Sequence, residues 1–230
     1  MKKTFGLLVR RPDLSEEEFH RHWSTVHREH ALKISNIRRY VQFHVEGNRN
    51  VAGFPATVVD GIPENWWDDM PAVMSLRDNP EYTENAGPDE ANFMDLTRKG
   101  RVVTTERVRV EGDGFFERPA PAIKAILLLA RAEGATGAEL EAFLDGPWAA
   151  QVAGLPGLVR HVDALAERGP DAPRSDYDAV AELWFATRAD LDAATGDLEA
   201  LAAALDGSPV DRARSASVVG TELRAIWPEA

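Results

Sequence analysis

Hydrophobic and polar positions along the chain change period in a regular order. Short apolar runs of strand length at 4–10 and 123–131 are each followed by a stretch in which apolar residues recur every three to four positions, as in a strand and an amphipathic helix. The pattern predicts strands at 4–10, 38–46, 54–61 and 101–109, a helix at 15–34 and a helical region at about 68–98. The same order returns as strands 123–131, 158–166, 177–186 and 217–226, helix 136–154 and helical region 190–214.

Each first helix begins with the same sequence signature. Ser15-x-x-Glu18 and Thr136-x-x-Glu139 are capping boxes, in which a hydroxyl and a carboxylate satisfy the first free amides of a helix. We therefore expect helices to begin at both places.

The two halves also resemble each other residue by residue. At an offset of 121 residues, identical or similar residues coincide at four strand positions, namely Lys3, Leu7, Leu8 and Arg10 with Lys124, Leu128, Leu129 and Arg131. The offset falls to 118 for Asp60, Glu64 and Trp66, which meet Asp178, Glu182 and Trp184. It falls to 116 for Asp95 and Arg98, which meet Asp211 and Arg214.

The repeated order β-α-β-β-α-β is that of the ferredoxin-like fold. A single such module leaves one face of its sheet uncovered. We therefore predict an α+β protein of two ferredoxin-like modules that pack sheet to sheet as an internal pseudo-dimeric α+β barrel. The predicted boundaries are a first copy at 1–111, a Gly- and Pro-bearing linker at 112–121 and a second copy at 122–230.

Composition excludes several classes of function. The chain of 230 residues has no cysteine, and 38 acidic against 26 basic residues give a net charge of −12. Thiolate chemistry and cysteine-bound metals are therefore excluded, and nucleic-acid and membrane partners are not expected. No apolar run is long enough to span a bilayer and no secretory leader is visible, so we expect a cytoplasmic protein.

Three motifs in the first copy resemble the EthD family of dimeric α+β barrel proteins. They are Phe19-x3-Trp23-x3-His27, the segment NIRRYVQFHV at 36–45, and DG-x4-W at 60–66. Their order and spacing together carry the resemblance, which covers nearly the whole chain once per copy and implies a tandem two-copy member.

The resemblance implies a small cofactor-independent enzyme that acts on an aromatic or polyketide-like molecule, of the lyase, isomerase, cyclase or decarboxylase type. The pocket would lie between the sheet and its helices. The alternative is a non-catalytic small-molecule binding or accessory protein. We expect no cofactor, a hydrophobic small-molecule ligand, and a monomer, with a homodimer as the second possibility.

Four of the six histidines lie between Phe19 and His30. On a regular helix Phe19, Trp23, His27 and His30 share one face, which places His27 near the interior and His22 in solvent. An imidazole in an apolar pocket can act as a general acid or base, so His27 is the predicted catalytic residue, with Tyr40 and His44 as helpers. Two alternatives stay open: a metal held by His27, His30 and His44, which we do not favour, and a structural His27 bonded to backbone.

The alternation of side chains along the predicted strand gives a second possible position for Tyr40 and His44. Tyr40 and His44 share one face of their strand, and Phe43 lies on the other. If Phe43 faces the helices, Tyr40 and His44 face the opposing sheet as interface residues.

The predicted ligand-binding residues are Trp23, Trp66, Arg10, His30 and Tyr82, of which Tyr82 lies in a turn-rich segment that could form a lid. The second copy has Trp148, His161 and Leu165 where the first has His27, Tyr40 and His44. We therefore expect one functional pocket, in the first copy, and a second copy that supplies packing. Residues kept in both copies, such as Glu64 and Glu182, are expected to have a structural role, such as turn formation or pairing across the pseudo-twofold, rather than a catalytic one.

Overall fold

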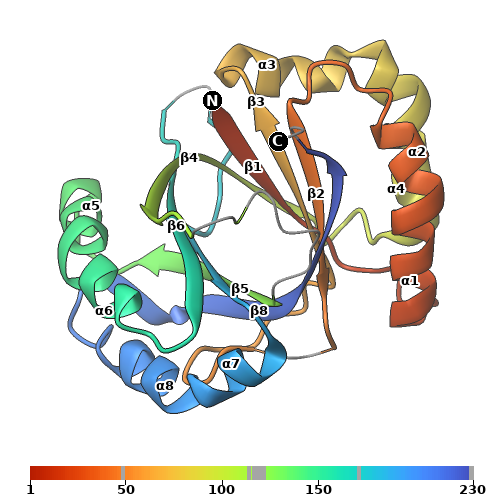
Figure 1. Ribbon diagram of the computed structural model, residues 1–230. Helices are drawn as coiled ribbons and strands as arrows, with labels where there is room; N and C mark the ends of the chain where they lie inside the picture. Colours follow the sequence, from red (N-terminus) through yellow and green to blue (C-terminus); the bar gives the residue numbers. More distant parts are fainter. Residues whose placement is uncertain (48–49, 113–114, 116–122, 170–171, 228–230) are drawn as a thin grey trace.

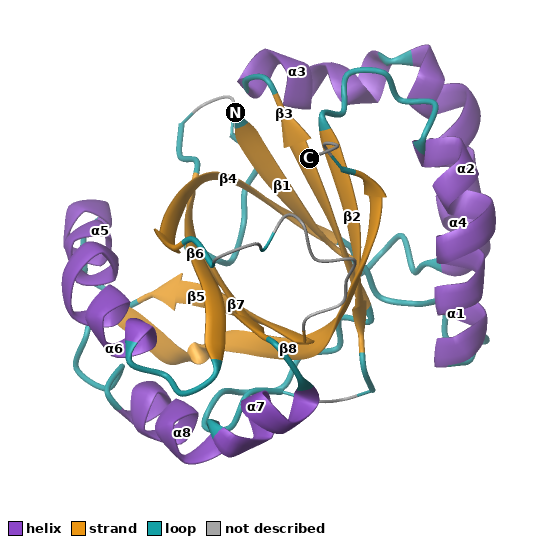
Figure 2. Ribbon diagram, viewed as in Figure 1, coloured by secondary structure: helices purple, strands orange, loops and turns teal. Residues whose placement is uncertain are grey.

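The computed structural model describes residues 1–47, 50–112, 115, 123–169 and 172–227. These residues form eight antiparallel strands that close into one barrel, with the helices outside it (Figures 1 and 2). The predicted linker at 112–121 lies, apart from Gly112 and Phe115, outside the described residues. None of the helices in the described ranges is long and apolar enough to cross a bilayer.

Each copy contributes four strands and its own helical layer. The first copy contains β1 (Lys2–Leu7), α1 (Glu16–His22), η1 (Trp23–His27), α2 (Arg28–Ala31), β2 (Arg39–Val45), β3 (Gly61–Trp67), α3 (Met70–Ser75), η2 (Leu76–Asp78), η3 (Tyr82–Ala86), α4 (Gly87–Phe93) and β4 (Gly100–Val110). The second contains β5 (Ile123–Arg131), α5 (Gly137–Phe143), η4 (Leu144–Trp148), α6 (Ala149–Ala153), β6 (Leu158–Ala166), β7 (Ala179–Phe185), α7 (Arg188–Ala193), α8 (Thr195–Ala203) and β8 (Val210–Ile226).

Strand pairing confirms the predicted architecture. The order around the barrel is β1-β3-β2-β8-β5-β7-β6-β4, and β4 pairs back with β1. Each copy thus forms the β4-β1-β3-β2 sheet of a ferredoxin-like module or its counterpart β8-β5-β7-β6. The outer strands join the copies as β2 with β8 and β4 with β6. Closure leaves none of these eight described strands with an unpaired edge for another chain to extend.

Both predicted capping boxes are present. The Ser15 and Thr136 hydroxyls each accept a hydrogen bond from the backbone amide three residues later, both at 3.2 Å. The Glu18 and Glu139 carboxylates accept in return from the backbone amides of these two cap residues, at 2.8 and 2.6 Å. Each cap therefore satisfies two amides that the helix itself leaves free.

The predicted third strand at 54–61 is wrong, because β3 occupies Gly61–Trp67. Pro63 and Asn65 disfavour a strand by propensity, yet β3 pairs with both β1 and β2. Gly6 on β1 allows this, since a Cβ atom there would lie 2.6 Å from Cγ of Pro63. The predicted helix at 190–214 is also too long: α8 ends at Ala203 and β8 begins at Val210.

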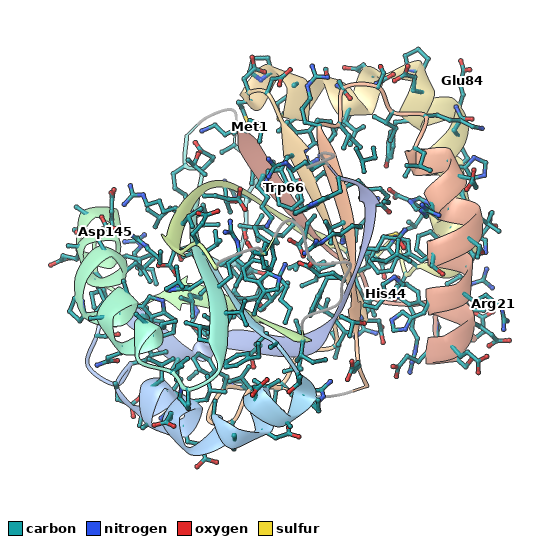
Figure 3. All side chains as sticks on the ribbon, in the orientation of Figure 1. Met1, Arg21, His44, Trp66, Glu84 and Asp145 are labelled. Carbon is teal, nitrogen blue, oxygen red and sulfur yellow. The ribbon has the colours of Figure 1, made fainter. Side chains whose placement is uncertain are left out.

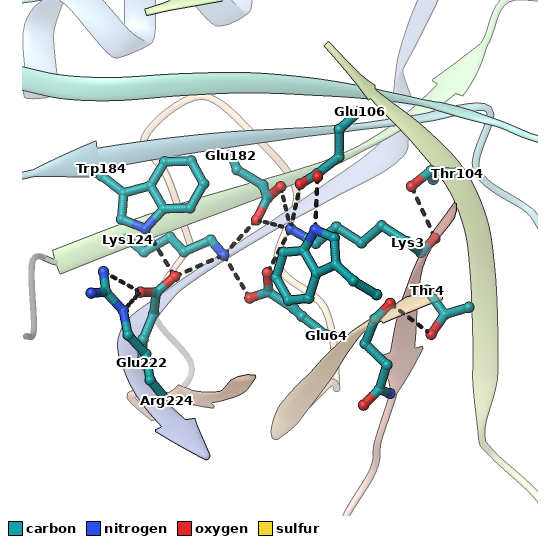
Figure 4. Close-up of polar contacts among 12 residues, drawn as sticks. Lys3, Thr4, Glu64, Thr104, Glu106, Lys124, Glu182, Trp184, Glu222 and Arg224 are labelled. Carbon is teal, nitrogen blue, oxygen red and sulfur yellow. Dashed lines mark hydrogen bonds and ion pairs between the residues drawn. The ribbon is translucent and has the colours of Figure 1, made fainter. Parts of the chain in front are cut away.

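A charged group that we call the central quartet, Lys3, Glu64, Lys124 and Glu182, lies inside the barrel (Figure 4). Lys3 Nζ lies 2.8 Å from Glu64 Oε2 and 2.7 Å from Glu182 Oε2. Lys124 Nζ lies 2.6 Å from Glu64 Oε1 and 2.5 Å from Glu182 Oε1. Each lysine therefore pairs with a carboxylate from each copy, as expected for residues kept in both.

A matching polar group flanks the quartet on each side of the pseudo-twofold. The Trp66 indole donates to Glu106 at 2.7 Å, and the Trp184 indole donates to Glu222 at 2.9 Å. The lysine ammonium groups also lie over these indoles, with Lys3 Nζ 4.1 Å from the Trp66 ring centre. Trp66 is thus part of the barrel interior.

The two glutamates of the quartet compete for ionisation. Burial raises the pKa of Glu64 to about 8. Burial opposes the ionisation of Glu182 as well, but the positive charges of Lys124 and Lys3 outweigh it and lower the pKa of Glu182 to about 2. Because burial and the repulsion between two neighbouring carboxylates both oppose full ionisation, the pair as a whole holds one proton more readily than two isolated carboxyls would.

We expect the Lys3→Met substitution to lower the free energy of unfolding by about 3–5 kcal/mol, because it removes one of the two cations that the buried carboxylates contact. Lys2→Met is the matched control. Lys2 pairs with Glu167 at 2.6 Å at a partly exposed position, so its loss should cost about 1 kcal/mol or less. Urea unfolding at pH 7 measures both, and equal costs would contradict a structural role for the quartet.

Candidate functional site

The histidine-rich segment forms one continuous helix with a wide turn in its middle. α1 passes into the π-helical turn η1 and then into α2 without a break. A π turn places residues five apart, here His22 and His27, on one side. Both side chains accordingly contact Asp89, at 3.0 Å from His22 Nε2 and 2.9 Å from His27 Nδ1. The prediction that His22 points into solvent, away from His27, is wrong because it assumed a regular helix.

Asp89 on α4 is buried between these imidazoles. It also accepts a hydrogen bond from Asn92 at 3.0 Å. Although burial opposes ionisation, the bonds from Asn92, His22 and His27 lower the pKa of Asp89. Burial lowers the pKa of His27 despite Asp89. A neutral His27 that donates from Nδ1 to an ionised Asp89 satisfies both shifts.

His44 and Tyr40 lie under the same helix rather than in the barrel. Figure 3 shows His44 between the barrel and α1, and its ring centre lies 4.8 Å from that of Trp23. Phe43, on the opposite face of β2, belongs to the apolar core inside the barrel. Tyr40 and His44 are therefore not interface residues between the two sheets.

Burial fixes the protonation of both side chains. It lowers the pKa of His44 to about 3, with a smaller contribution from His20. It raises the pKa of Tyr40 to about 12. The Tyr40 hydroxyl accepts from Gln42 at 2.8 Å, and His44 Nε2 lies 3.2 Å from the Gln42 amide oxygen. Both are neutral near pH 7 and packed.

The other predicted binding residues have separate surroundings. Trp23 is fully buried beside Phe19. Arg10 contacts Asp60 through its backbone amide, at 2.8 Å, and its guanidinium, at 3.6 Å, as Arg131 does with Asp178. His30 Nδ1 is buried without a hydrogen-bond partner in the described part of the chain. Across that part, no three His, Asp or Glu side chains converge as a metal site would need.

A cavity of about 480 Å³ lies between the first-copy sheet and its helices. We call it the first-copy cavity. It opens between two apolar clusters of the first copy, one around Trp67 and the other around Phe93. Its lining comprises Thr4, Gly6, Leu8, Pro63, Asn65, Trp67, Leu76, Arg77, Tyr82, Glu90, Met94, Lys99, Gly100, Arg101, Pro173 and Arg174. Of the predicted site residues, Tyr82 alone is among them.

The second copy fills the corresponding space. Gly6 and Asn65 of the first copy correspond to Leu127 and Leu183 of the second, by the offsets of 121 and 118 residues. Both leucines belong to one continuous apolar cluster beneath the second-copy helices. Trp148 is fully buried in this cluster and donates to Asp163 at 3.1 Å. The helix-to-sheet space is thus open in one copy and packed in the other.

A hydrogen-bonded pair of side chains lies in the cavity wall. The Tyr82 hydroxyl donates to Glu90 at 2.8 Å, and the other Glu90 oxygen accepts from Lys99 at 2.9 Å. Burial, helped by the charge of Glu90, raises the pKa of Tyr82. The phenol therefore keeps its proton at neutral pH and acts as a hydrogen-bond donor.

Sequence reasoning missed most of the cavity. Glu90 and Lys99 lie in polar segments without a motif, and Arg174 comes from the second copy. One signal was available: at outward-facing sheet positions the first copy has Thr4, Gly6 and Asn65, where the second has larger or apolar residues.

We expect His44→Leu, which introduces the residue found at the equivalent second-copy position, to reduce acid sensitivity. Unfolded histidine titrates near pH 6.5, whereas folded His44 does so at about 3. As pH falls through this window only the unfolded chain gains this proton, so the wild type loses about 1–2 kcal/mol between pH 7 and 5. Urea midpoints at both pH values measure the loss, and parallel profiles for the variant and the wild type would refute it.

Comparison with known proteins supports both the domain and the fold. Residues 11–97 match the family described as the EthD domain. No curated protein matches the sequence. An anthrone oxidase-like protein has a similar structure, with a TM-score of 0.62 and 10% identity over 100% of this chain and 95% of that one.

Two further solved structures share the fold. One, from Fusobacterium nucleatum and provisionally named a monooxygenase, has a TM-score of 0.57 at 4% identity over 96% and 91% of the two chains. The other, provisionally named a chlorite dismutase, has a TM-score of 0.56 at 11% identity over 98% and 96%. At such identities these likenesses show the fold alone. Residues 11–97 are therefore an EthD domain, in a chain whose two halves close into the fold of the dimeric α+β barrels.

Proposed function

We propose that this protein is a cofactor-independent enzyme that binds a flat, hydrophobic small molecule in the first-copy cavity and converts it by proton transfer. The ligand would be aromatic or polyketide-like, and the chemistry of the lyase or isomerase kind. The observation that carries the proposal is the cavity itself, with an apolar wall and the Tyr82–Glu90 pair at one side.

The size and walls of the cavity suit such a ligand. Its volume of about 480 Å³ falls in the range of small-molecule sites. Trp67, Leu8 and Met94 contribute apolar atoms to the lining, and the Met94 side chain can adapt to the ligand. Asn65 and Tyr82 supply polar groups that can orient the ligand.

The Tyr82–Glu90 pair can transfer protons in two directions. A Glu90 carboxylate can accept a proton from a ligand carbon or hydroxyl group, and the Tyr82 hydroxyl can donate to a ligand oxygen on which charge develops. Lys99 holds Glu90 at 2.9 Å. This division into base and donor requires no cofactor.

His27 was the predicted acid–base residue, and this role stays a prediction. His27 contacts Asp89 and Phe93, neither of which lines the cavity. Glu90 and Met94, their neighbours on the chain, do line it. We therefore assign the proton transfer to Tyr82 and Glu90, and consider that the His27–Asp89 contact positions α4.

A non-catalytic role is the second candidate. Glu90 already bonds both Tyr82 and Lys99, so the pair could serve only to shape the wall. The protein would then bind or carry a metabolite without changing it.

We expect the paired substitution Gly6→Leu with Pro63→Ala to close the cavity. The second copy has this combination, with Leu127 paired to Ala181, and the alanine removes the Pro63 ring that a side chain at Gly6 would meet. With neutral 2-naphthol as a fluorescent probe, the variant should bind at least about tenfold more weakly than the wild type. Unchanged binding in a variant with native circular dichroism would place the ligand elsewhere.

A screen of aromatic and polyketide-type compounds, followed by mass spectrometry, tests for turnover. For any compound that is converted, Tyr82→Phe should lower kcat by about 10²- to 10⁴-fold and change KM little. His27→Gln should leave kcat within about threefold. The opposite pattern would assign the chemistry to His27, and binding without turnover across the screen would favour the non-catalytic role.

A further inference from the structure

Three arginines at the cavity have no carboxylate partner among the residues that the structure describes. Arg77 comes from η2, Arg101 from β4 and Arg174 from the segment between β6 and β7. In the described part of the chain, none of the three side chains lies within ion-pair distance of an acidic group. Glu90, the acidic residue of the lining, is instead taken by Tyr82 and Lys99.

The three arginines gather at one cavity in a chain with an excess of acidic residues. Many arginines elsewhere on the surface have carboxylate partners, as in the pairs Arg11–Asp13, Arg38–Asp68, Arg168–Asp178 and Arg212–Asp206. With 38 acidic residues and a net charge of −12, partners are plentiful. Three unmatched guanidinium groups around one cavity therefore mark a local positive region.

Two of the three groups, Arg77 and Arg101, are close enough to influence each other. Burial lowers the pKa of Arg101 and the charge of Arg77 lowers it further, whereas Tyr82 and Glu90 oppose this shift. Gathering like charges costs free energy that a bound anion would recover. An adjoining hollow of about 440 Å³ shares Lys99, Arg101 and Arg174 with the cavity. The charged residues that it adds are Asp176 and Arg168, and Arg168 pairs with Asp178, so the excess of positive charge lies at the shared residues.

We infer that the ligand of the first-copy cavity carries an anionic group, a carboxylate or a phosphate, which Arg77, Arg101 and Arg174 bind while the apolar body rests against Trp67. This inference rests on the proposed function and adds the ligand's charge. Guanidinium groups suit the role because they present paired donors to either anion.

The second copy has more than a packing role in this arrangement. Arg174 and Pro173 bring it to the cavity lining. The first copy alone would hold the apolar body and two of the three arginines. The site is therefore complete only in the closed barrel, which gives the tandem arrangement a function.

Three probes that share one ring system and differ in the attached group test the inference: 2-naphthoate, 2-naphthyl phosphate and neutral 2-naphthol. Binding of each to the full chain is followed by fluorescence at low salt and pH 7. We expect at least one of the two anions to bind the wild type about tenfold or more tightly than 2-naphthol. The tighter of the two identifies the anionic group.

Arginine variants then locate the anion. Arg101→Ala and Arg174→Ala should each weaken the tighter anion about tenfold and change 2-naphthol binding less than about threefold. Arg101→Lys keeps the charge but loses the paired donors, and should fall between alanine and the wild type. Arg214→Ala, at an exposed second-copy arginine outside both hollows, is the matched control and should have no effect.

The possible outcomes separate the two proposals. If 2-naphthol binds the wild type as tightly as both anions, or if the arginine variants weaken all three probes equally, the anion site is refuted and the apolar cavity stands. If no probe binds the wild type, the proposed function and the anion site both fail. Loss of anion binding in Arg214→Ala equal to that in Arg174→Ala would show a general charge effect and also refute the site.

Discussion

The structure depends on the burial of four charges at the centre of the barrel. Each of Lys3 and Lys124 contacts Glu64 and Glu182, so each ammonium group needs a carboxylate from the other copy. A single module would leave these charges only half matched in an apolar sheet face, which is costly. Pairing of the two copies satisfies them and joins both pairs of outer strands.

This constraint divides the molecule into a symmetric interior and an asymmetric exterior. Inside, Trp66 with Glu106 is repeated by Trp184 with Glu222. Outside, the second copy packs one continuous apolar cluster under its helices, whereas the first copy has two clusters with a cavity between them. The interior joins the two copies, and the first-copy exterior contains the cavity that we propose as the ligand site.

Sequence comparison between the copies predicted the features that are symmetric. Lys3 and Glu64 recur as Lys124 and Glu182, and the interpretation that such residues pair across the pseudo-twofold agrees with their contacts. The same comparison aligned 60–67 with 178–185, which is where β3 and β7 lie. The local pattern at 54–61 misled because it was apolar and β-branched, although residues 54–60 belong to no strand.

Features that depend on local departures from regular geometry were not predictable in the same way. The π turn at 23–27 brings His22 beside His27, where a regular helix would separate them. The cavity forms because the outer face of the sheet has a small residue, Gly6, and a polar residue, Asn65. Its other lining residues include arginines that are distant in sequence. Hydrophobic periodicity in a sequence identifies apolar residues that pack against each other. It gives no signal at positions where the packing leaves a cavity.

A crystal structure of the wild-type protein with 2-naphthoate would test the central claim, that the cavity is the ligand site and both copies complete it. We expect the naphthyl ring to lie beside Trp67 and the carboxylate to lie within hydrogen-bonding distance of Arg101 and Arg174. A ligand bound inside the barrel near the central quartet, beside His27 and Asp89, or on the surface of the second copy would contradict it.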